Sequence, residues 1–142
     1  MQKLESVQSG FVYMGRLSYN SDLLDSLSEV CRERGVTLGR IEAIGALRGA
    51  RLGYYDQKSL EYKYLTWDKG LEITSLMGNI SIKDGEPMVH AHLTLADEEG
   101  RTFGGHLARG CPVFACEFIL RVYSGPDFVR SHDTQTGLPL WS

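Results

Sequence analysis

Residues 89–107 read Val-His-Ala-His-Leu-Thr-Leu-Ala-Asp-Glu-Glu-Gly-Arg-Thr-Phe-Gly-Gly-His-Leu and hold three of the four histidines of the chain. Side chains alternate between the two faces of a β-strand, so His90 and His92 share one face. The other face takes the apolar side chains of Val89, Ala91, Leu93 and Leu95. The stretch therefore begins with a strand that has one polar and one apolar face.

The residues after this strand predict a tight hairpin. Asp97-Glu98-Glu99-Gly100 suits a three-residue loop, in which a type I turn is closed by a glycine in the left-handed region. If Asp97 pairs with Arg101, His92 lies directly opposite His106. A two- or four-residue loop would pair His106 with Ala91 instead and send it to the wrong face. The register of the histidines therefore depends on the turn type.

This register predicts a metal site. Directly opposed side chains have Cβ atoms about 5 Å apart, which lets imidazoles share one ion, and the ligands would be His90, His92 and His106. Zinc suits such donors, although no fixed spacing signature is met. The alternative is that these histidines are polar residues on a solvated face or hydrogen-bonded at an interface. Gly104 and Gly105 leave the nearby backbone bare for a close approach or a bulge.

Composition limits the class of protein. A chain of 142 residues with 42% hydrophobic and 23% charged residues predicts one globular domain over residues 1–142. The net charge of -3 and the lack of a Lys/Arg run argue against a surface built for nucleic acid. No signal peptide and no apolar run long enough for a membrane are present in the sequence, so a cytoplasmic protein is expected.

The remaining elements predict an α+β fold. One helix is expected after Ser21 as N-cap, with apolar residues at helical spacing from Leu23 to Cys31 and an end at Gly35. No further helices alternate with the strands, which favours a twisted, mostly antiparallel sheet with one helix packed on it. Besides the histidine hairpin, strands are expected at 11–17, 38–46, 50–56, 61–67, 71–82 and 113–123.

The cysteines and the C-terminal residues each allow a structural and a functional interpretation. Cys31, Cys111 and Cys116 are interpreted as small buried side chains rather than metal ligands. Residues 124–142 are expected to be extended, and Trp141 suggests that this tail docks on its own subunit or on a neighbour. The neighbours His132 and Asp133 could form an oriented general base, but a surface pair is favoured because no nucleophile adjoins them.

Several short segments, taken in order, resemble the plants-and-prokaryotes-conserved (PPC) domain. The resemblance covers the chain from about Phe11 to Trp141. Each piece is weak, but together their order and spacing are specific. The matching segments are residues 45–48, 52–56, 71–73, 75–76, 78–80, 84–85 with Pro87, 90–92, 104–107 and 136–138.

This resemblance implies a homotrimer of α+β subunits. It also implies a metal ion, zinc before other divalent transition metals, held near the subunit boundary by the His-x-His and Gly-Gly-His elements. In plant members an AT-hook grips DNA and this domain assembles subunits, but the present chain has no Arg-Gly-Arg-Pro hook. Of the plant partner-binding segment, Glu72 and Ile73 are kept, while its arginine and phenylalanine are lost.

Three functions follow from these features. The first is a trimeric, metal-holding module that binds a small molecule or a protein partner, supported by exposed-looking aromatics whose plainer role is strand packing: Tyr54, Tyr55, Tyr62, Tyr64 and Trp67. The second is transcription-related DNA binding through Arg16, Arg40, Arg48, Arg51, Arg101, Arg109 and Arg121, which are more often solvated or paired with acids. The third is a metal-dependent hydrolase-like enzyme, with an acid or base from Glu72, Asp84, Glu86 or Glu117.

One charged pair is predicted at an interface. Arg48 and Glu72 both lie in family-like segments and would be costly to bury alone. They are therefore expected to pair with each other or with a neighbouring subunit, and Ile73 is expected beside them at a partner surface.

Overall fold

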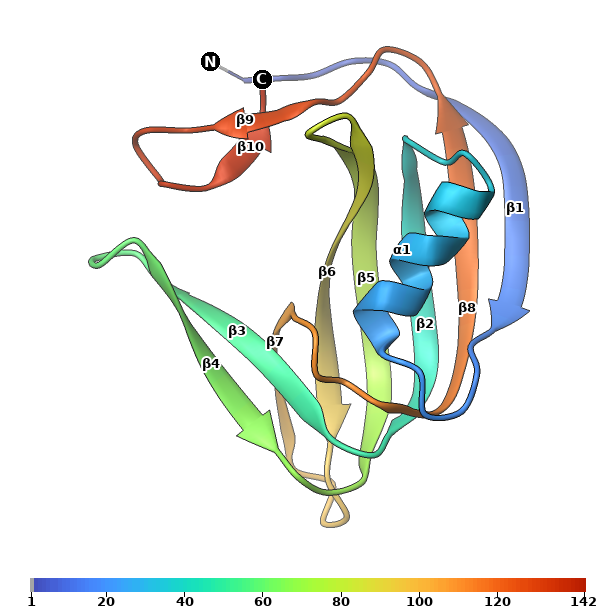
Figure 1. Ribbon diagram of the computed structural model, residues 1–142, viewed down its shortest axis with the longest axis vertical. Helices are drawn as coiled ribbons and strands as arrows, with labels where there is room; N and C mark the ends of the chain where they lie inside the picture. The colour runs from blue at the N-terminus through green and yellow to red at the C-terminus, as the bar shows by residue number, and fades with distance from the viewer. Residues whose placement is uncertain (1) are drawn as a thin grey trace.

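An eight-stranded sheet forms the body of the protein, and one helix covers one of its faces (Figure 1). The computed structural model describes residues 2–142. Its elements are β1 Gln8–Arg16, α1 Leu23–Glu33, β2 Gly39–Leu47, β3 Ala50–Asp56, β4 Glu61–Trp67, β5 Leu71–Lys83, β6 Glu86–Ala96, β7 Thr102–Leu107, β8 Val113–Ser124, β9 Arg130–His132 and β10 Pro139–Trp141. The sheet order is β1-β8-β2-β5-β6-β7-β3-β4, and all neighbours are antiparallel.

The strands agree closely with the sequence-based expectation. The β3 and β4 strands match it residue for residue, whereas β1 begins at Gln8 rather than at Phe11. The chain is a single domain with a mostly antiparallel sheet, as expected. The label α+β fits only loosely, because the one helix of the described residues is 11 residues long and the fold is largely β.

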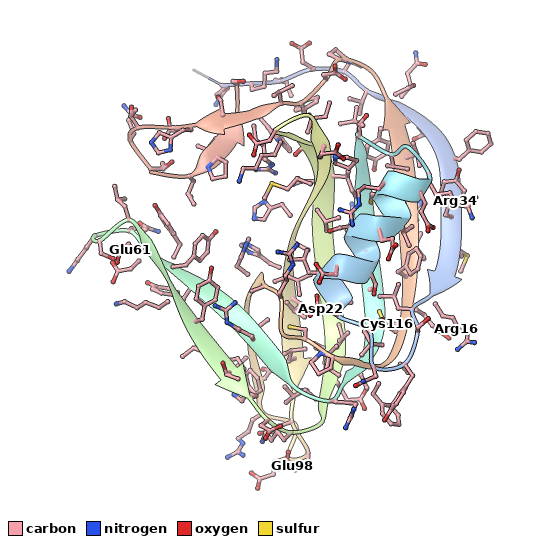
Figure 2. All side chains as sticks on the ribbon, in the orientation of Figure 1. Arg16, Asp22, Arg34, Glu61, Glu98 and Cys116 are labelled. Atoms are coloured by element: carbon pink, nitrogen blue, oxygen red, sulfur yellow. The ribbon has the colours of Figure 1, made fainter. Side chains whose placement is uncertain are left out.

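The helix begins one residue later than the expected cap. Asp22, labelled at the start of α1 in Figure 2, is the N-cap, and its Oδ1 accepts the Asp25 N–H at 3.0 Å. The hydroxyl of the expected cap Ser21 instead donates to the Ser18 carbonyl at 2.8 Å. At the other end Gly35 has φ +63°, a conformation that favours glycine and ends the helix.

The apolar stripe of α1 packs on the sheet and forms the core. Leu23, Leu27 and Cys31 are fully buried, and burying each leucine contributes roughly 1.5–3 kcal/mol. All three cysteines are free and buried, and burial raises the pKa of each thiol to about 11. The interpretation of the cysteines as small buried side chains is therefore confirmed.

The opposite side of the sheet, called here the outward face, carries a transverse row of residues that face their partners across the strands. Directly opposed residues share a face, so the pairing from β1 to β7 places the row on one surface. The row runs Met14, Ile119, Glu42, Met77, His92, His106. The histidines therefore lie on the surface that α1 leaves uncovered.

Two hairpins flank the histidine end of this face. In Figure 1 the β3–β4 hairpin projects from the sheet, and the small β9–β10 hairpin crosses the end of β5. The Tyr55 hydroxyl donates to the Thr136 carbonyl at 2.6 Å and so joins the two. Trp141 packs edge-on against Phe128 within the tail, with ring centroids 4.8 Å apart. Arg130 of the tail donates to Ser81 and Asn79 of β5, both at 2.8 Å, which confirms that the tail docks on its own subunit. Within residues 2–142, no helix has the length and apolar character needed to cross a membrane.

Candidate metal centre

The hairpin between β6 and β7 has the turn that the sequence predicts. The Asp97 N–H donates to the Arg101 carbonyl at 3.0 Å, and the Gly100 N–H donates to the Asp97 carbonyl at 2.9 Å. Gly100 has φ +75°, the left-handed conformation expected of the third loop residue. This turn sets His92 directly opposite His106, so the predicted register is confirmed.

The three histidines of the hairpin converge. One ring nitrogen from each of His90, His92 and His106 lies within 4.8 Å of the other two. The ring centroids are 5.1 to 5.5 Å apart, and the His90 and His106 rings are half-buried while His92 is exposed. Three imidazoles at such distances are a donor set that a single transition-metal ion can draw together.

The chemistry of these rings fits a cation. Nδ1 of His106 is buried and has no hydrogen-bond partner among the described residues. Burial lowers the pKa of both His90 and His106 to about 4, and the nearby Arg130 charge and the other imidazoles act in the same direction. Both rings are therefore neutral at pH 7, which is the form that ligates a metal.

A buried arginine adjoins the histidines. Arg130 of β9 is 9% exposed, and its Nη2 lies 3.4 Å from Nδ1 of His90. The same guanidinium donates to Ser81 Oγ at 2.8 Å, Asn79 Oδ1 at 2.8 Å and the Pro139 carbonyl at 3.0 Å. Sequence spacing did not find Arg130, because it reaches the site through the tail. The only signal for it was the expectation that this tail docks.

Aromatic residues complete one wall. The Tyr62 ring packs on His106 with centroids 4.8 Å apart, and Tyr55 packs edge-on against Tyr62 at 5.0 Å. Together with the histidines they line a cavity of about 580 Å³. Trp67 has the strand-packing role, because its ring stacks on Phe103 with centroids 4.5 Å apart. Of the predicted aromatic set, three tyrosines line the cavity: Tyr54, Tyr55 and Tyr62.

The glycines beside His106 serve the sheet itself. A Cβ added at Gly104 would lie 2.3 Å from the Leu93 carbonyl oxygen, and one at Gly105 would lie 2.7 Å from that of Gly53. The close approach that these glycines predicted is therefore the approach of the neighbouring strands.

The other predicted site residues lie apart from the histidines. Arg48 donates to Asn20 Oδ1 at 2.6 Å and forms no ion pair with Glu72, which is exposed on β5. Ile73 is 3% exposed and packs in the core, where it stabilises the subunit itself. Pairing of Arg48 with Glu72 inside one subunit is thus excluded, and pairing with a neighbouring subunit stays a prediction.

None of the carboxylates considered for acid–base chemistry reaches the histidines. Within the described part of the chain, no aspartate or glutamate lines the histidine cavity, so the cavity residues do not include Glu72, Asp84, Glu86 or Glu117. His132 is exposed, and Asp133 accepts both the N–H and the hydroxyl of Thr136, at 2.8 and 2.7 Å. Asp133 therefore shapes the β9–β10 turn rather than orienting His132.

Known proteins resemble this chain over nearly its whole length. A metal-containing protein of Archaeoglobus fulgidus is 41% identical, has a TM-score of 0.95 and covers 99% of both chains. A protein of Bacteroides thetaiotaomicron with a provisional DNA-binding label is 25% identical, with a TM-score of 0.87 and 96% of both chains covered. The bifunctional protein GlmU of Synechococcus sp. (strain JA-3-3Ab) is 37% identical over 128 residues, which are 89% of this chain but 19% of that protein.

The family assignment rests on the sequence as a whole. The profile of the Plants and Prokaryotes Conserved (PCC) domain matches residues 4–124, which include β1 to β8 and all three histidines of the hairpin. The resemblance read from short segments is therefore confirmed: the chain belongs to the Plants and Prokaryotes Conserved domain family.

Proposed function

We propose that this protein is a trimeric module that holds a divalent transition-metal ion, zinc first, and binds a small molecule or a protein partner beside it. The observation that carries the proposal is the convergence of His90, His92 and His106 within 4.8 Å on two paired strands. The metal-containing relative from Archaeoglobus fulgidus supports it. Three imidazole donors leave room for a further ligand on the ion.

The residues around the histidines suit this role. A bound ion would supply a Lewis-acidic centre, while the protein contributes orientation and a partly dry wall. Tyr62 packs on His106, and the Arg130 guanidinium lies against His90, so both rings are held by neighbours from other elements. The cavity is lined by neutral, aromatic and basic groups, which favours ligand binding over hydrolysis because hydrolysis needs a nearby acid or base.

The outward face supports assembly of subunits. Ile44 lies on the interior strand β2 with 57% exposure, and Met14 and Met77 on β1 and β5 are 79% and 53% exposed. Large apolar side chains gathered on one exposed face of a sheet mark interaction sites in proteins. Burial of this surface between copies would place the histidine row beside a subunit boundary.

Metal analysis tests the proposal. Tag-free protein should contain one transition-metal ion per subunit by elemental analysis, and His92→Ala should lose it. His132→Ala is the matched control, because it removes the one histidine outside the cluster, an exposed side chain in β9. Absence of metal from the wild-type protein, or equal metal content in both variants, would contradict the proposal.

DNA binding is the second candidate, favoured by the label on the Bacteroides relative. The charges argue for placing it second. Four of the seven arginines considered for it form ion pairs with carboxylates: Arg40, Arg101, Arg109 and Arg121. The net charge of -3 adds no attraction to phosphate.

A further inference from the structure

Arg130 is a buried cation without a negative partner. Its side chain reaches into the histidine cavity from β9, yet no carboxylate of residues 2–142 lies within 4.0 Å of its nitrogens. Its hydrogen bonds to Ser81, Asn79 and the Pro139 carbonyl are all to neutral acceptors. Its remaining polar contact is with the imidazole nitrogen Nδ1 of His90. Buried charges in proteins are normally paired, because neutral hydrogen bonds do not cancel the charge.

The cavity as a whole has the same imbalance. Lys83 and Arg130 are the charged residues among those that line it in the described chain, and both are basic. A divalent cation on the three neutral imidazoles would add two further positive charges beside Arg130. Because like charges repel strongly where water is scarce, such a site requires a negative ligand.

The hydrogen-bond donors of Arg130 indicate where this negative ligand would bind. A guanidinium has five N–H groups, and the three hydrogen bonds above occupy Nε and one N–H on each of the terminal nitrogens. The second N–H of Nη2 faces His90 Nδ1 at 3.4 Å, and one N–H on Nη1 remains without a partner. The guanidinium therefore lies against a metal-binding ring and keeps one donor for a further acceptor.

The rest of the lining is apolar. Around the basic groups lie the rings of Tyr55 and Tyr62, which pack on each other, and Tyr62 also packs on His106. The lining includes four further side chains without charge: Met88, Leu138, Pro139 and Leu140. A volume of about 580 Å³ lies within the range of small-molecule sites. Such a lining suits the body of a small organic molecule better than a fully hydrated inorganic ion.

We infer that the histidine cavity binds a small organic carboxylate, with Arg130 as the residue that recognises its negative charge. The inference deepens the proposed function and rests on it, since the carboxylate would occupy the space beside the metal-binding histidines. A carboxylate matches both demands of the site, because its oxygens accept charge-assisted hydrogen bonds from arginine and also ligate transition metals.

Calorimetric titration with benzoate tests the inference on zinc-loaded, full-length protein. Benzoate should bind, its neutral isostere benzamide should bind at least tenfold more weakly, and Arg130→Gln should weaken benzoate at least tenfold. Arg109→Gln is the matched control, because Arg109 is an exposed arginine whose side chain is 76% exposed and pairs with Asp25. Its affinity for benzoate should equal that of the wild-type protein.

A second variant covers the chance that Arg130→Gln disturbs the fold. Asn79→Asp leaves Arg130 in place but puts a carboxylate 2.8 Å from its Nη2, where the amide oxygen now lies. This internal partner should compete with benzoate and weaken it at least tenfold, while circular dichroism and metal content stay unchanged. Equal benzoate affinity in the wild type and in both folded variants would overturn the inference.

The remaining outcomes separate this inference from the proposed function. Metal-loaded protein that binds no benzoate would overturn the carboxylate site and leave the metal proposal standing. Protein that takes up no metal, yet binds benzoate and loses that binding in Arg130→Gln, would overturn the metal proposal and keep the carboxylate site. Stronger binding of inorganic phosphate than of benzoate would overturn the assignment to an organic carboxylate.

Discussion

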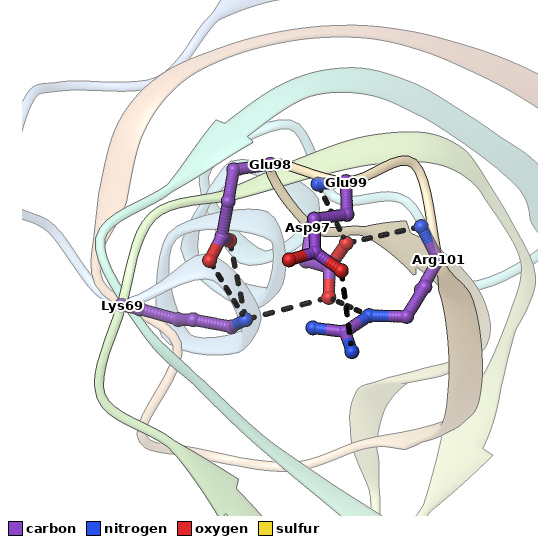
Figure 3. A network of polar contacts seen from close by, with 5 residues as sticks. All are labelled: Lys69, Asp97, Glu98, Glu99 and Arg101. Carbon is purple, nitrogen blue, oxygen red and sulfur yellow. Dashed lines mark hydrogen bonds and ion pairs between the residues drawn. The ribbon is translucent and has the colours of Figure 1, made fainter.

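Asp97 is the residue on which the geometry of the histidine hairpin depends most. Its Oδ1 accepts the N–H groups of Glu99 and Arg101 at 3.0 Å, and its Oδ2 accepts the Arg101 side chain at 2.9 Å. Figure 3 shows Lys69 completing this network with Glu98. The carboxylate thus holds the loop whose length decides whether His92 and His106 share a face.

This network makes a pH-dependent contribution to stability. Burial raises the pKa of Asp97, but hydrogen bonds from Arg101 and Glu99 outweigh it and lower the pKa from 3.8 to about 2. A folded pKa below the unfolded one means that the stabilisation is complete above about pH 4 and is lost as the pH falls towards about 2.

Asp97→Asn should therefore lower the thermal midpoint at pH 7, and the gap to the wild type should narrow below pH 4 and close near pH 2. Melting curves at several pH values measure this gap. Glu98→Gln is the control, because Glu98 is exposed and pairs only with Lys69. A gap that stays constant from pH 7 to pH 2 would exclude the charge of Asp97 as its cause.

At the scale of elements, Asp22 ties α1 to the loop that follows the histidine hairpin. Its Oδ1 caps the helix, and its Oδ2 accepts the N–H groups of Gly110 at 2.8 Å and Cys111 at 3.1 Å. These N–H groups belong to the loop between β7 and β8. One side chain therefore satisfies donors from two elements, and the helix is fixed to the sheet at its first turn.

We expect Asp22→Ala to cost about 1–3 kcal/mol of unfolding free energy, because it removes a cap and leaves loop N–H groups without a partner. Ser21→Ala should cost less than about 0.5 kcal/mol, since Ser21 is not the cap. Urea denaturation followed by circular dichroism measures both. A larger loss for Ser21→Ala than for Asp22→Ala would contradict the assignment of the cap.

At the scale of the whole molecule, the outward face is the surface on which a single copy leaves apolar side chains exposed to solvent. The helix protects one side of the sheet, while Ile44 of the interior strand β2 stays open to solvent on the other side. The sheet also has open edges at β1 and β4, which proteins usually cover or blunt. Both features favour assembly, by face or by edge.

A trimer of 15.9 kDa subunits would have a mass of about 48 kDa, three times the chain mass, by light scattering after size exclusion. If the outward face forms the contact, Ile44→Glu should lower this mass towards 15.9 kDa without changing the circular dichroism spectrum. Leu65→Glu on the edge strand β4 is equally exposed and tests the edge alternative. A wild-type mass of one subunit would exclude the trimer.

The sequence by itself determined the histidine pair and its turn, because both depend on local rules. Alternation places His90 and His92 on one face, and the loop from Asp97 to Gly100 sets His106 opposite them. Strand positions followed from runs of β-branched, aromatic and apolar residues separated by turn residues. What local rules missed at short range was which of two adjacent candidates caps the helix, because the Asp25 N–H donates to Asp22 rather than to Ser21.

Only the tertiary structure decided what surrounds the histidines. Arg130 arrives from a hairpin 24 residues beyond His106, and Tyr62 arrives from β4, 28 residues before His90. No spacing rule links such positions, because their contacts arise from the crossing of elements rather than from the repeat of a strand. The three histidine donors of the site thus come from one hairpin. The Arg130 charge and the Tyr62 ring beside them come from elements that the tertiary fold brings to this hairpin.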